Sequence, residues 1–301
     1  MKKSGPLTIK DKIILATGLF SLVLLTVSVV IAERNPAFMP AGIENQAYDH
    51  MKRCIETISE SHSLIGPELS ELTTTLGDRA AKQTTLNPAF ASLIVRLLSD
   101  AGVRKGDAIA VGCSGSFPGL LIAVLSASAA MELEPGIILS LGASSFGASD
   151  PDFTILDMHM LLHEKGLTQH LPLAVSPGGD LDIGREMEPE TVSRLVESVP
   201  QYGIPLIFEG NLVRNRAIRD SIYFSGSDDG ITAFINSGGG YANMGTSSLS
   251  LLLKPGIVRK AKMPPPESRG VIHDMLERRV PVIHLLYIKG IATRYRIPWD
   301  E

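Results

Sequence analysis

The feature that most constrains the fold is a regular alternation of short strand-like runs with helical stretches between residues 107 and 286. The strand-like runs are apolar, four to seven residues long, and lie at 108–111, 137–141, 171–175, 205–208, 231–235 and 280–286. The helical stretches occupy 117–132, 154–165, 189–199, 212–222, 244–253 and 267–278. This alternation predicts an α/β fold with a mostly parallel, doubly wound sheet and helices on both of its faces.

A second constraint is an uncharged run of twenty residues at 13–32. A helix of that length spans about 30 Å, the thickness of a bilayer's hydrocarbon core. Four lysines precede the run: Lys2, Lys3, Lys10 and Lys12. Because Glu33 and Arg34 nearly cancel on the other side, the positive-inside rule predicts a transmembrane helix with residues 1–12 in the cytoplasm. The alternative is a signal peptide cleaved after Ala32, although the run exceeds the usual 7–15 residues of a signal core.

The remaining chain divides by its composition. Residues 33–43 contain two prolines and predict a linker, and residues 44–106 predict a helical segment with helices at 44–63 and 88–98. A short helix or turn is expected at 67–78. Residues 107–301 then form the extracytoplasmic α/β domain. A second uncharged run, at 108–131, is interrupted by glycines and a proline, so it predicts a buried strand and helix rather than a second span.

Composition excludes several classes of protein. The hydrophobic fraction of 44% and the charged fraction of 20% are those of a globular chain, and the net charge of −4 gives no support for a nucleic-acid partner. Only two cysteines occur, Cys54 and Cys113. They allow one disulfide in an exported domain but have no zinc-site spacing, and we expect no metal and no cofactor.

Glycine- and serine-rich loops follow four of the predicted strands. The carboxyl ends of parallel strands meet at one edge of a sheet, where such folds bind ligands. Glycine lets backbone amides approach a ligand closely, and amides at helix N-termini favour anions. The predicted ligand-binding residues are Gly112, Ser114, Gly115, Ser116, Ser144, Ser145, Gly178, Gly179, Asp180, Asn236, Ser237, Gly238, Gly239 and Gly240. The competing interpretation is that such loops are simply rich in these residues. The sequence does not distinguish phosphate from carboxylate, and neither GxxxxGK(S/T) nor GxGxxG is present.

Ser114 is a candidate for a catalytic nucleophile. It lies between small residues at a predicted strand–turn–helix, which resembles a nucleophile elbow, although the fifth position of that motif is Ser116 instead of glycine. Ser114 or Ser116 could instead only cap the following helix. Five histidines could supply the base: His159, His163, His170, His273 and His284. His159 and His163, four residues apart on one helix face, could also bind a metal ion as a pair, but no HExxH arrangement supports a metal site.

Charged residues near the strand ends give further candidates. Asp180 and Asp182 follow one strand and Glu209 follows another, where a carboxylate could ligate a cation or a substrate amine. Three arginines could hold a carboxylate ligand, although charges of this kind usually belong to solvated helix faces: Arg214, Arg216 and Arg219.

Three segments carry a family resemblance. Residues 140–162, SLGASSFGASDPDFTILDMHMLL, resemble part of the poly-gamma-glutamate system proteins, which are bacterial membrane proteins encoded beside the poly-gamma-glutamate ligase. Residues 112–120, GCSGSFPGL, and 237–245, SGGGYANMG, are also similar, as is the predicted anchor. The resemblance extends from the anchor to about Tyr287. It brings no catalytic residues with it.

The resemblance implies a single-pass protein of the bacterial cell membrane with its C-terminal domain outside the cytoplasm. Its partners would be the membrane and either the poly-gamma-glutamate synthase subunits or the polymer itself. The function implied is an accessory role in making or exporting a capsule or a released polymer. The alternative is an exported hydrolase, using a serine or a carboxylate, that trims or releases the polymer. A third possibility is a purely structural subunit whose helix packs with other membrane subunits. The absence of a complete catalytic or nucleotide motif supports the accessory role.

Overall fold

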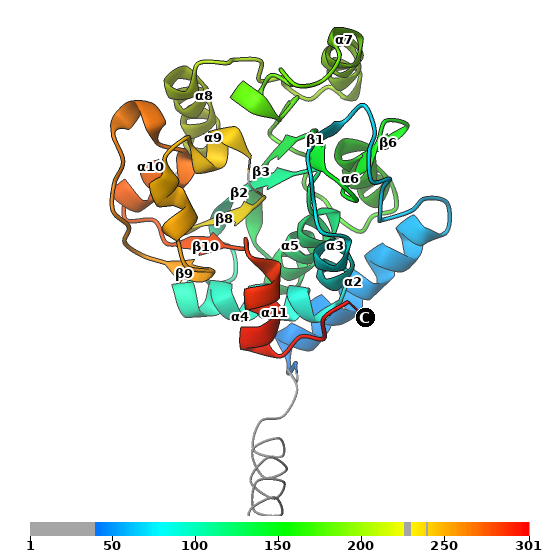
Figure 1. Cartoon of the computed structure of the whole chain (residues 1–301). Helices are drawn as coiled ribbons and strands as arrows, with labels where there is room; N and C mark the ends of the chain where they lie inside the picture. The colour runs from blue at the N-terminus through cyan, green and yellow to red at the C-terminus, as the bar shows by residue number, and fades with distance from the viewer. Residues whose placement is uncertain (1–39, 226–229, 239, 301) are drawn as a thin grey trace, which may run out of the picture. The chain divides into compact units, whose positions relative to one another are not determined.

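The computed structural model describes residues 40–225, 230–238 and 240–300, and Pro40–Glu301 form one compact unit (Figure 1). The predicted transmembrane run at 13–32 lies outside the described residues. Among the helices that are described, none is long and apolar enough to cross a membrane. The helical segment at 44–106 belongs to the same compact unit as the sheet.

The unit is built on a six-stranded sheet with the order β7-β3-β2-β8-β10-β9. All neighbours pair in parallel except β9, which is antiparallel to β10 at the edge. The strands are β2 (Ala108–Ser114), β3 (Glu134–Ser140), β7 (Ala174–Ser176), β8 (Ala233–Ser237), β9 (Gly256–Val258) and β10 (Val282–His284). The predicted α/β fold with a mostly parallel sheet is confirmed.

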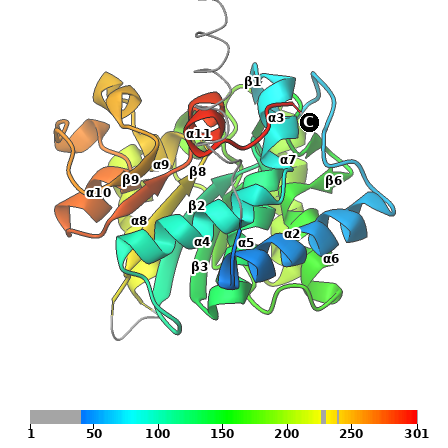
Figure 2. The same cartoon turned by 90° about the horizontal axis from the view of Figure 1, so that it is seen from below.

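Helices cover both faces of this sheet. On one face α2 (Ile43–Ser59), α4 (Ala89–Ala101) and α5 (Pro118–Met131) pack against one another, as Figure 2 shows. On the other face α8 (Leu212–Phe224) and α10 (Val271–Glu277) join a cluster that includes Ala110, Ile138 and Phe234 of the central strands. Side chains alternate along a strand, so the neighbouring residues Ile109 and Val111 are left for the opposite face. Burial on both faces explains why the central strands are continuous apolar runs.

The remaining elements are short and mostly connect or flank the main layers. The strands are β1 (Thr73–Thr75), β4 (Ala143–Ser144), β5 (Ser149–Asp150) and β6 (Phe153–Thr154). The α-helices are α3 (Arg79–Thr85), α6 (Ile155–Glu164), α7 (Pro189–Ser198), α9 (Tyr241–Met244) and α11 (Ile288–Tyr295). The 3-10 helices are η1 (Asp180–Asp182), η2 (Val199–Tyr202), η3 (Ser248–Leu252) and η4 (Pro266–Ser268).

Local signals set several of the boundaries. Pro118 opens α5, where its missing N–H is no loss, and Gly102 ends α4 in a left-handed conformation with φ 101°. Thr154 and Asp157 form a capping box at α6: the Thr154 hydroxyl accepts the Asp157 N–H, and the Asp157 carboxylate accepts the Thr154 N–H at 2.8 Å.

Three predicted elements differ from those in the structure. Residues 205–208 are not a strand, because Pro205 has no N–H for a ladder and only Leu206 makes a single bridge to Val175. The helix expected at 244–253 is divided into α9 and η3. Gly245, with φ 72°, turns the chain there, and a Cβ on it would overlap the backbone at Ser268 and Gly270. The helix or turn at 67–78 contains β1, which pairs with β4 in a small parallel ribbon.

The two cysteines are free and buried. Cys54 lies in α2, where its Sγ is 3.5 Å from His50 Nδ1, whereas Cys113 lies in β2 with its Sγ 3.6 Å from Ser237 Oγ. They belong to separate layers of the unit. The disulfide that the sequence allowed is absent.

Candidate functional site

A cavity of about 580 Å³ lies at the carboxyl edge of the central strands. Five of the predicted ligand-binding residues line it: Ser114, Ser116, Ser144, Gly179 and Gly240. Another part of the lining comes from β1, α3 and the turn between them, a segment to which the sequence assigned no site. This segment contributes Lys82 and Asp78, and the other polar residues of the lining include Glu186 and Tyr241. The strand-end loops therefore meet at one edge, as parallel pairing requires.

The other predicted residues that the structure describes do not line the cavity. Gly112 and Gly115 permit close packing: a Cβ on Gly112 would overlap the Asn243 amide, and one on Gly115 would lie 2.6 Å from the Leu141 carbonyl oxygen. Buried positions are taken by Ser145, Asn236 and Ser237. The rest are Gly178 and Gly238, both with positive φ, and Asp180; Gly239 lies outside the described residues.

The loop after β7 already binds an anion of its own. The Glu186 carboxylate accepts the Asp180 N–H through both oxygens, at 2.9 and 2.7 Å. It also lies directly against Gly179, where a Cβ would come within 2.5 Å of Glu186 Oε1. The Asp180 amide that we expected to face a ligand is therefore occupied by a side chain of the same protein.

Lys82 is the functional candidate that the sequence did not reveal. It lies on α3, its side chain is only 2% exposed, and its Nζ donates to Ser144 Oγ at 2.6 Å. The ammonium also lies over the Phe117 ring, 3.6 Å from the centroid. No carboxylate in the described ranges forms an ion pair with it. Burial lowers the pKa of Lys82 to about 8, and the charge of Asp78 opposes that shift only in part.

Ser144 is held in place by its neighbours. Its backbone N–H donates to Ser116 Oγ at 3.0 Å, which joins the loops after β2 and β3. Gly77 lies so close that a Cβ there would be 3.0 Å from Ser144 Oγ and 2.7 Å from the Ser145 carbonyl oxygen. A glycine is needed at this position for the segment that carries Lys82 to approach Ser144.

Ser114 lacks the partners of a catalytic triad. Its Oγ is buried without a hydrogen-bond partner in the part of the chain that the structure describes, and Gly238 lies directly against it. The five candidate histidines make other contacts: His159 with the His170 carbonyl, His163 with the Thr168 carbonyl, His170 with Glu134, His273 with the Gly270 N–H and His284 with Asn236. Burial lowers the pKa of both His159 and His284 to about 4, which keeps these rings neutral. No cluster of three or more His, Cys, Asp or Glu with metal-site geometry occurs among the described residues.

A buried ionic network supports the floor of the cavity. The Asp182 carboxylate accepts from Arg219 Nη2 at 2.6 Å, Asn215 Nδ2 at 2.9 Å and Ser176 Oγ at 2.8 Å. Asp182 and Arg219 are each 1% exposed. Ser140, which lines the cavity, donates to the same carboxylate at 3.3 Å. Asp182 therefore ties the ends of β3 and β7 to α8 and is not available to a ligand.

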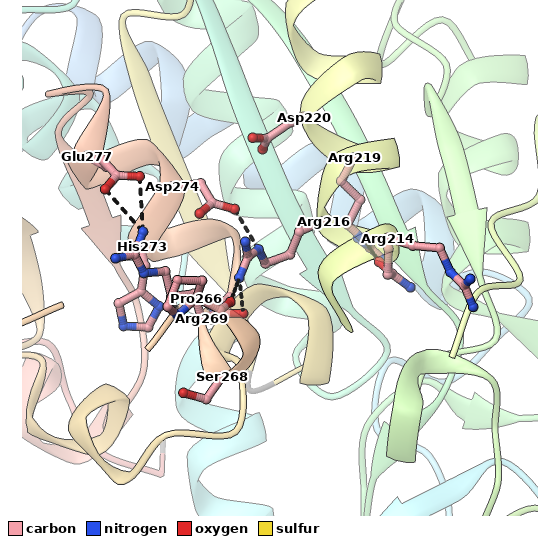
Figure 3. Close-up of polar contacts among 12 residues, drawn as sticks. Arg214, Arg216, Arg219, Asp220, Pro266, Ser268, Arg269, His273, Asp274 and Glu277 are labelled. Carbon is pink, nitrogen blue, oxygen red and sulfur yellow. Dashed lines mark hydrogen bonds and ion pairs between the residues drawn. The ribbon is translucent and has the colours of Figure 1, made fainter. Parts of the chain in front are cut away.

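The other two arginines of α8 are engaged as well (Figure 3). Arg216 forms an ion pair with Asp274 at 2.7 Å and donates to the carbonyl oxygens of Pro266 and Arg269, which joins α8 to α10 and η4. Arg214 pairs with Glu209 at 3.0 Å and points away from that cluster. The three arginines that were candidates for holding a carboxylate ligand all have partners within the protein.

No protein-family model, curated protein or solved structure matches this chain. The cavity presents one buried amine, the hydroxyls of Ser114, Ser116, Ser140 and Ser144, and a glycine-rich edge beside the N-terminus of α5.

Proposed function

We propose that the cavity binds a carboxylate-bearing ligand and that the protein is an accessory component of poly-gamma-glutamate synthesis or export, anchored in the bacterial cell membrane. The observation that carries the proposal is the Lys82 amine, which is buried at the cavity without an ion-pair partner in the described ranges. Below its pKa of about 8 this amine is an ammonium, and an uncompensated buried charge favours an anionic ligand. The resemblance of residues 140–162 to the poly-gamma-glutamate system proteins supports the choice of polymer.

Two further features of the cavity limit the kind of ligand that it can bind. Ser116 and Phe117 lead into α5, whose fourteen residues contribute partial positive charge at the cavity. Asp78 and Glu186 also line the cavity, so a long polyanion passing through it would be repelled. The balance of charge favours a short segment or a chain end that presents one carboxylate to Lys82.

Binding can be measured by calorimetry with the full chain in detergent micelles and a short gamma-linked glutamate oligomer. Replacing Lys82 with Met should weaken binding by about ten- to a hundredfold, because a charge-assisted hydrogen bond contributes about 1.5–3 kcal/mol. Lys105→Met is the matched control: Lys105 is exposed and pairs with Glu132 at the opposite edge of the sheet. Equal affinity in wild type and Lys82→Met would remove Lys82 from the site. No binding at millimolar oligomer and low salt would exclude the polymer as the ligand and leave the synthase subunits as partners, to be tested by co-purification.

The membrane anchor is a separate part of the proposal, supported by the lysines that precede the uncharged run at 13–32. A reporter that is active only outside the cytoplasm should work when it is fused after Glu301. Activity from a cytoplasmic reporter alone would contradict this topology, and processing after Ala32 would support a cleaved signal peptide.

The alternative function, an exported hydrolase, is favoured by one observation, the contact between the Lys82 amine and the Ser144 hydroxyl.

A further inference from the structure

We propose that Ser144 and Lys82 form a catalytic dyad that hydrolyses an amide or ester bond in the cavity, with Ser144 Oγ as the nucleophile and Lys82 Nζ as its base. The inference rests on the proposed function for its substrate, a gamma-linked glutamate chain. Its nucleophile and base rest on the geometry of the cavity alone.

The two side chains have the geometry of a nucleophile and its base. Lys82 Nζ and Ser144 Oγ are 2.6 Å apart, within the distance that a general base needs from the proton it removes. The two residues are 62 positions apart in sequence and belong to different elements, α3 and β4, yet both line the cavity. A nucleophile and its base thus face a space that is large enough for a peptide segment.

The surroundings of Lys82 favour the neutral form of its amine. A lysine with only a structural role would add little to the stability of the fold at this position. Removing its ammonium from water is costly, and the neutral Ser144 hydroxyl and the face of the Phe117 ring compensate for that cost only in part. A lysine that works as a neutral base benefits from the same surroundings, since burial favours the uncharged amine. With a pKa of about 8, Lys82 has a substantial neutral fraction at a mildly alkaline pH.

A hydroxyl group and a helix N-terminus lie where they can stabilise the negative charge that develops on the substrate. Ser116 Oγ accepts the Ser144 N–H, and its own hydroxyl hydrogen has no acceptor within the described ranges. That hydrogen is free to donate to a carbonyl oxygen beside Ser144. The N-terminus of α5 begins two residues later and adds favourable potential for an oxyanion.

The reaction balances with water as the only co-reactant. Neutral Lys82 takes the hydroxyl proton as Ser144 Oγ bonds to the carbonyl carbon, and the carbonyl π electrons move to its oxygen. The tetrahedral intermediate reforms the carbonyl and breaks the bond from carbon to the leaving nitrogen, which takes the proton from the Lys82 ammonium. Water then attacks the acyl-serine ester, gives a proton to Lys82, and breaks the bond to Ser144 Oγ, which regains that proton.

The dyad and the carboxylate complex use different protonation states of the same amine. A substrate carbonyl reacts when Lys82 is neutral, whereas the carboxylate product is held when Lys82 is an ammonium. Reactivity should therefore rise, and carboxylate affinity should fall, as the pH increases through about 8. A lysine with only a structural role would not produce these opposite pH profiles.

The test uses an alkyl fluorophosphonate, which labels activated serines, on the full chain in detergent, together with release of new amino groups from a gamma-linked glutamate oligomer. Wild type should be labelled on Ser144 with a rate that rises to a plateau around a midpoint near pH 8. Ser144→Ala should lose this label. Lys82→Met and Lys82→Arg should both slow labelling at least about a hundredfold, because general-base catalysis contributes about 10²–10⁴-fold. Arginine keeps the charge but does not deprotonate, so only Lys82→Arg should retain carboxylate binding.

Ser128→Ala is the matched control, because Ser128 is a buried serine like Ser144, but it lies in α5, its hydroxyl contacts no base in the described ranges, and its side chain does not line this cavity. Its labelling should equal that of wild type, and circular dichroism of each variant establishes that it is folded. Unlabelled Ser144 in folded wild type, labelling unchanged in Lys82→Arg, or a rate that is flat from pH 7 to 9 would each overturn the dyad. Oligomer binding that persists in any of those cases would still support the proposed function, whereas labelling without binding would support the dyad and refute the polymer as substrate.

Discussion

Replacing Asp182 with Asn tests whether the buried network beneath the cavity holds the strand ends together. Asp182 and Arg219 are each 1% exposed, and their side chains meet at 2.6 Å. Asparagine keeps the shape of the side chain and tolerates the left-handed backbone of Asp182, whose φ is 62°. The substitution therefore removes one charge with little other change.

The size of the effect follows from what the carboxylate does. The side chain of the Asp182→Asn variant would keep one oxygen to accept from Arg219 Nη2 and Asn215 Nδ2, and the hydroxyls of Ser140 and Ser176 could rotate to accept from the new amide. Most hydrogen bonds would survive, and the main cost would be an unpaired buried guanidinium. Breaking a buried ion pair in this way costs about 3–5 kcal/mol, and we expect the lower end of that range. For a domain of this size, about 3 kcal/mol lowers Tm by roughly 6–12 °C.

Thermal unfolding of the full chain in detergent, followed by circular dichroism at one pH, measures the change. The control is the exposed pair Lys52–Glu56, whose side chains are 62% and 60% exposed, so that Lys52→Ala should alter stability by less than about 0.5 kcal/mol. Adding Arg219→Met to Asp182→Asn should recover part of the loss, because the unpaired charge is then gone. A Tm within about 2 °C of wild type for Asp182→Asn alone would refute the reasoning.

Three further predictions follow from single contacts. The pKa of Lys82 is near 10.5 in the unfolded chain and about 8 in the folded chain, so between these pH values the unfolded chain binds more protons at Lys82. The free energy of unfolding should therefore rise with pH in that window, by up to about 3 kcal/mol. Urea titrations at pH 7.5 and 10 should show a smaller rise for Lys82→Met than for wild type. Burial raises the pKa of Cys54 to about 11 and that of Cys113 to about 12, so neither thiol should react with Ellman's reagent at pH 8 until denaturant is added; two rapid equivalents in native protein would show that the thiols are accessible. Gly238→Ala should destabilise the domain by about 1–3 kcal/mol in the same thermal assay, since φ is +135° and the new Cβ would overlap Ser114 Oγ; an unchanged Tm would mean that this loop adopts another conformation.

Lys82 illustrates why part of the site could not be predicted from the sequence. It lies in a short helix, RAAKQTT, with no apolar stripe, and a lone lysine in such a segment is usually solvated. Its significance depends on Ser144 and Phe117. Ser144 can approach it because Gly77 allows close contact with the loop after β3. Gly77 was the one local signal that could have pointed to this segment, since a glycine before an N-cap aspartate suggests a close approach.

Arg219 shows the same limit for charge. Because Arg219 lies in the same helix as Arg214 and Arg216, the sequence favours a solvated helix face for all three arginines. In the structure Arg219 is instead buried against Asp182. Both residues of that pair were named in the sequence as candidates for contacting a ligand. Their partnership is settled by the packing of α8 against the ends of β3 and β7.

The sequence by itself determined the layers of this protein, because strand and helix periods, Pro118 at the start of α5 and Gly102 at the end of α4 act over a few neighbouring residues. It also predicted that loops from separate strands meet at one edge, since parallel pairing leaves no other arrangement. Only the tertiary structure decided which side chains face the cavity there. The pairings of Lys82 with Ser144, of Asp182 with Arg219 and of Glu186 with the loop after β7 depend on burial and distance, which no local pattern encodes.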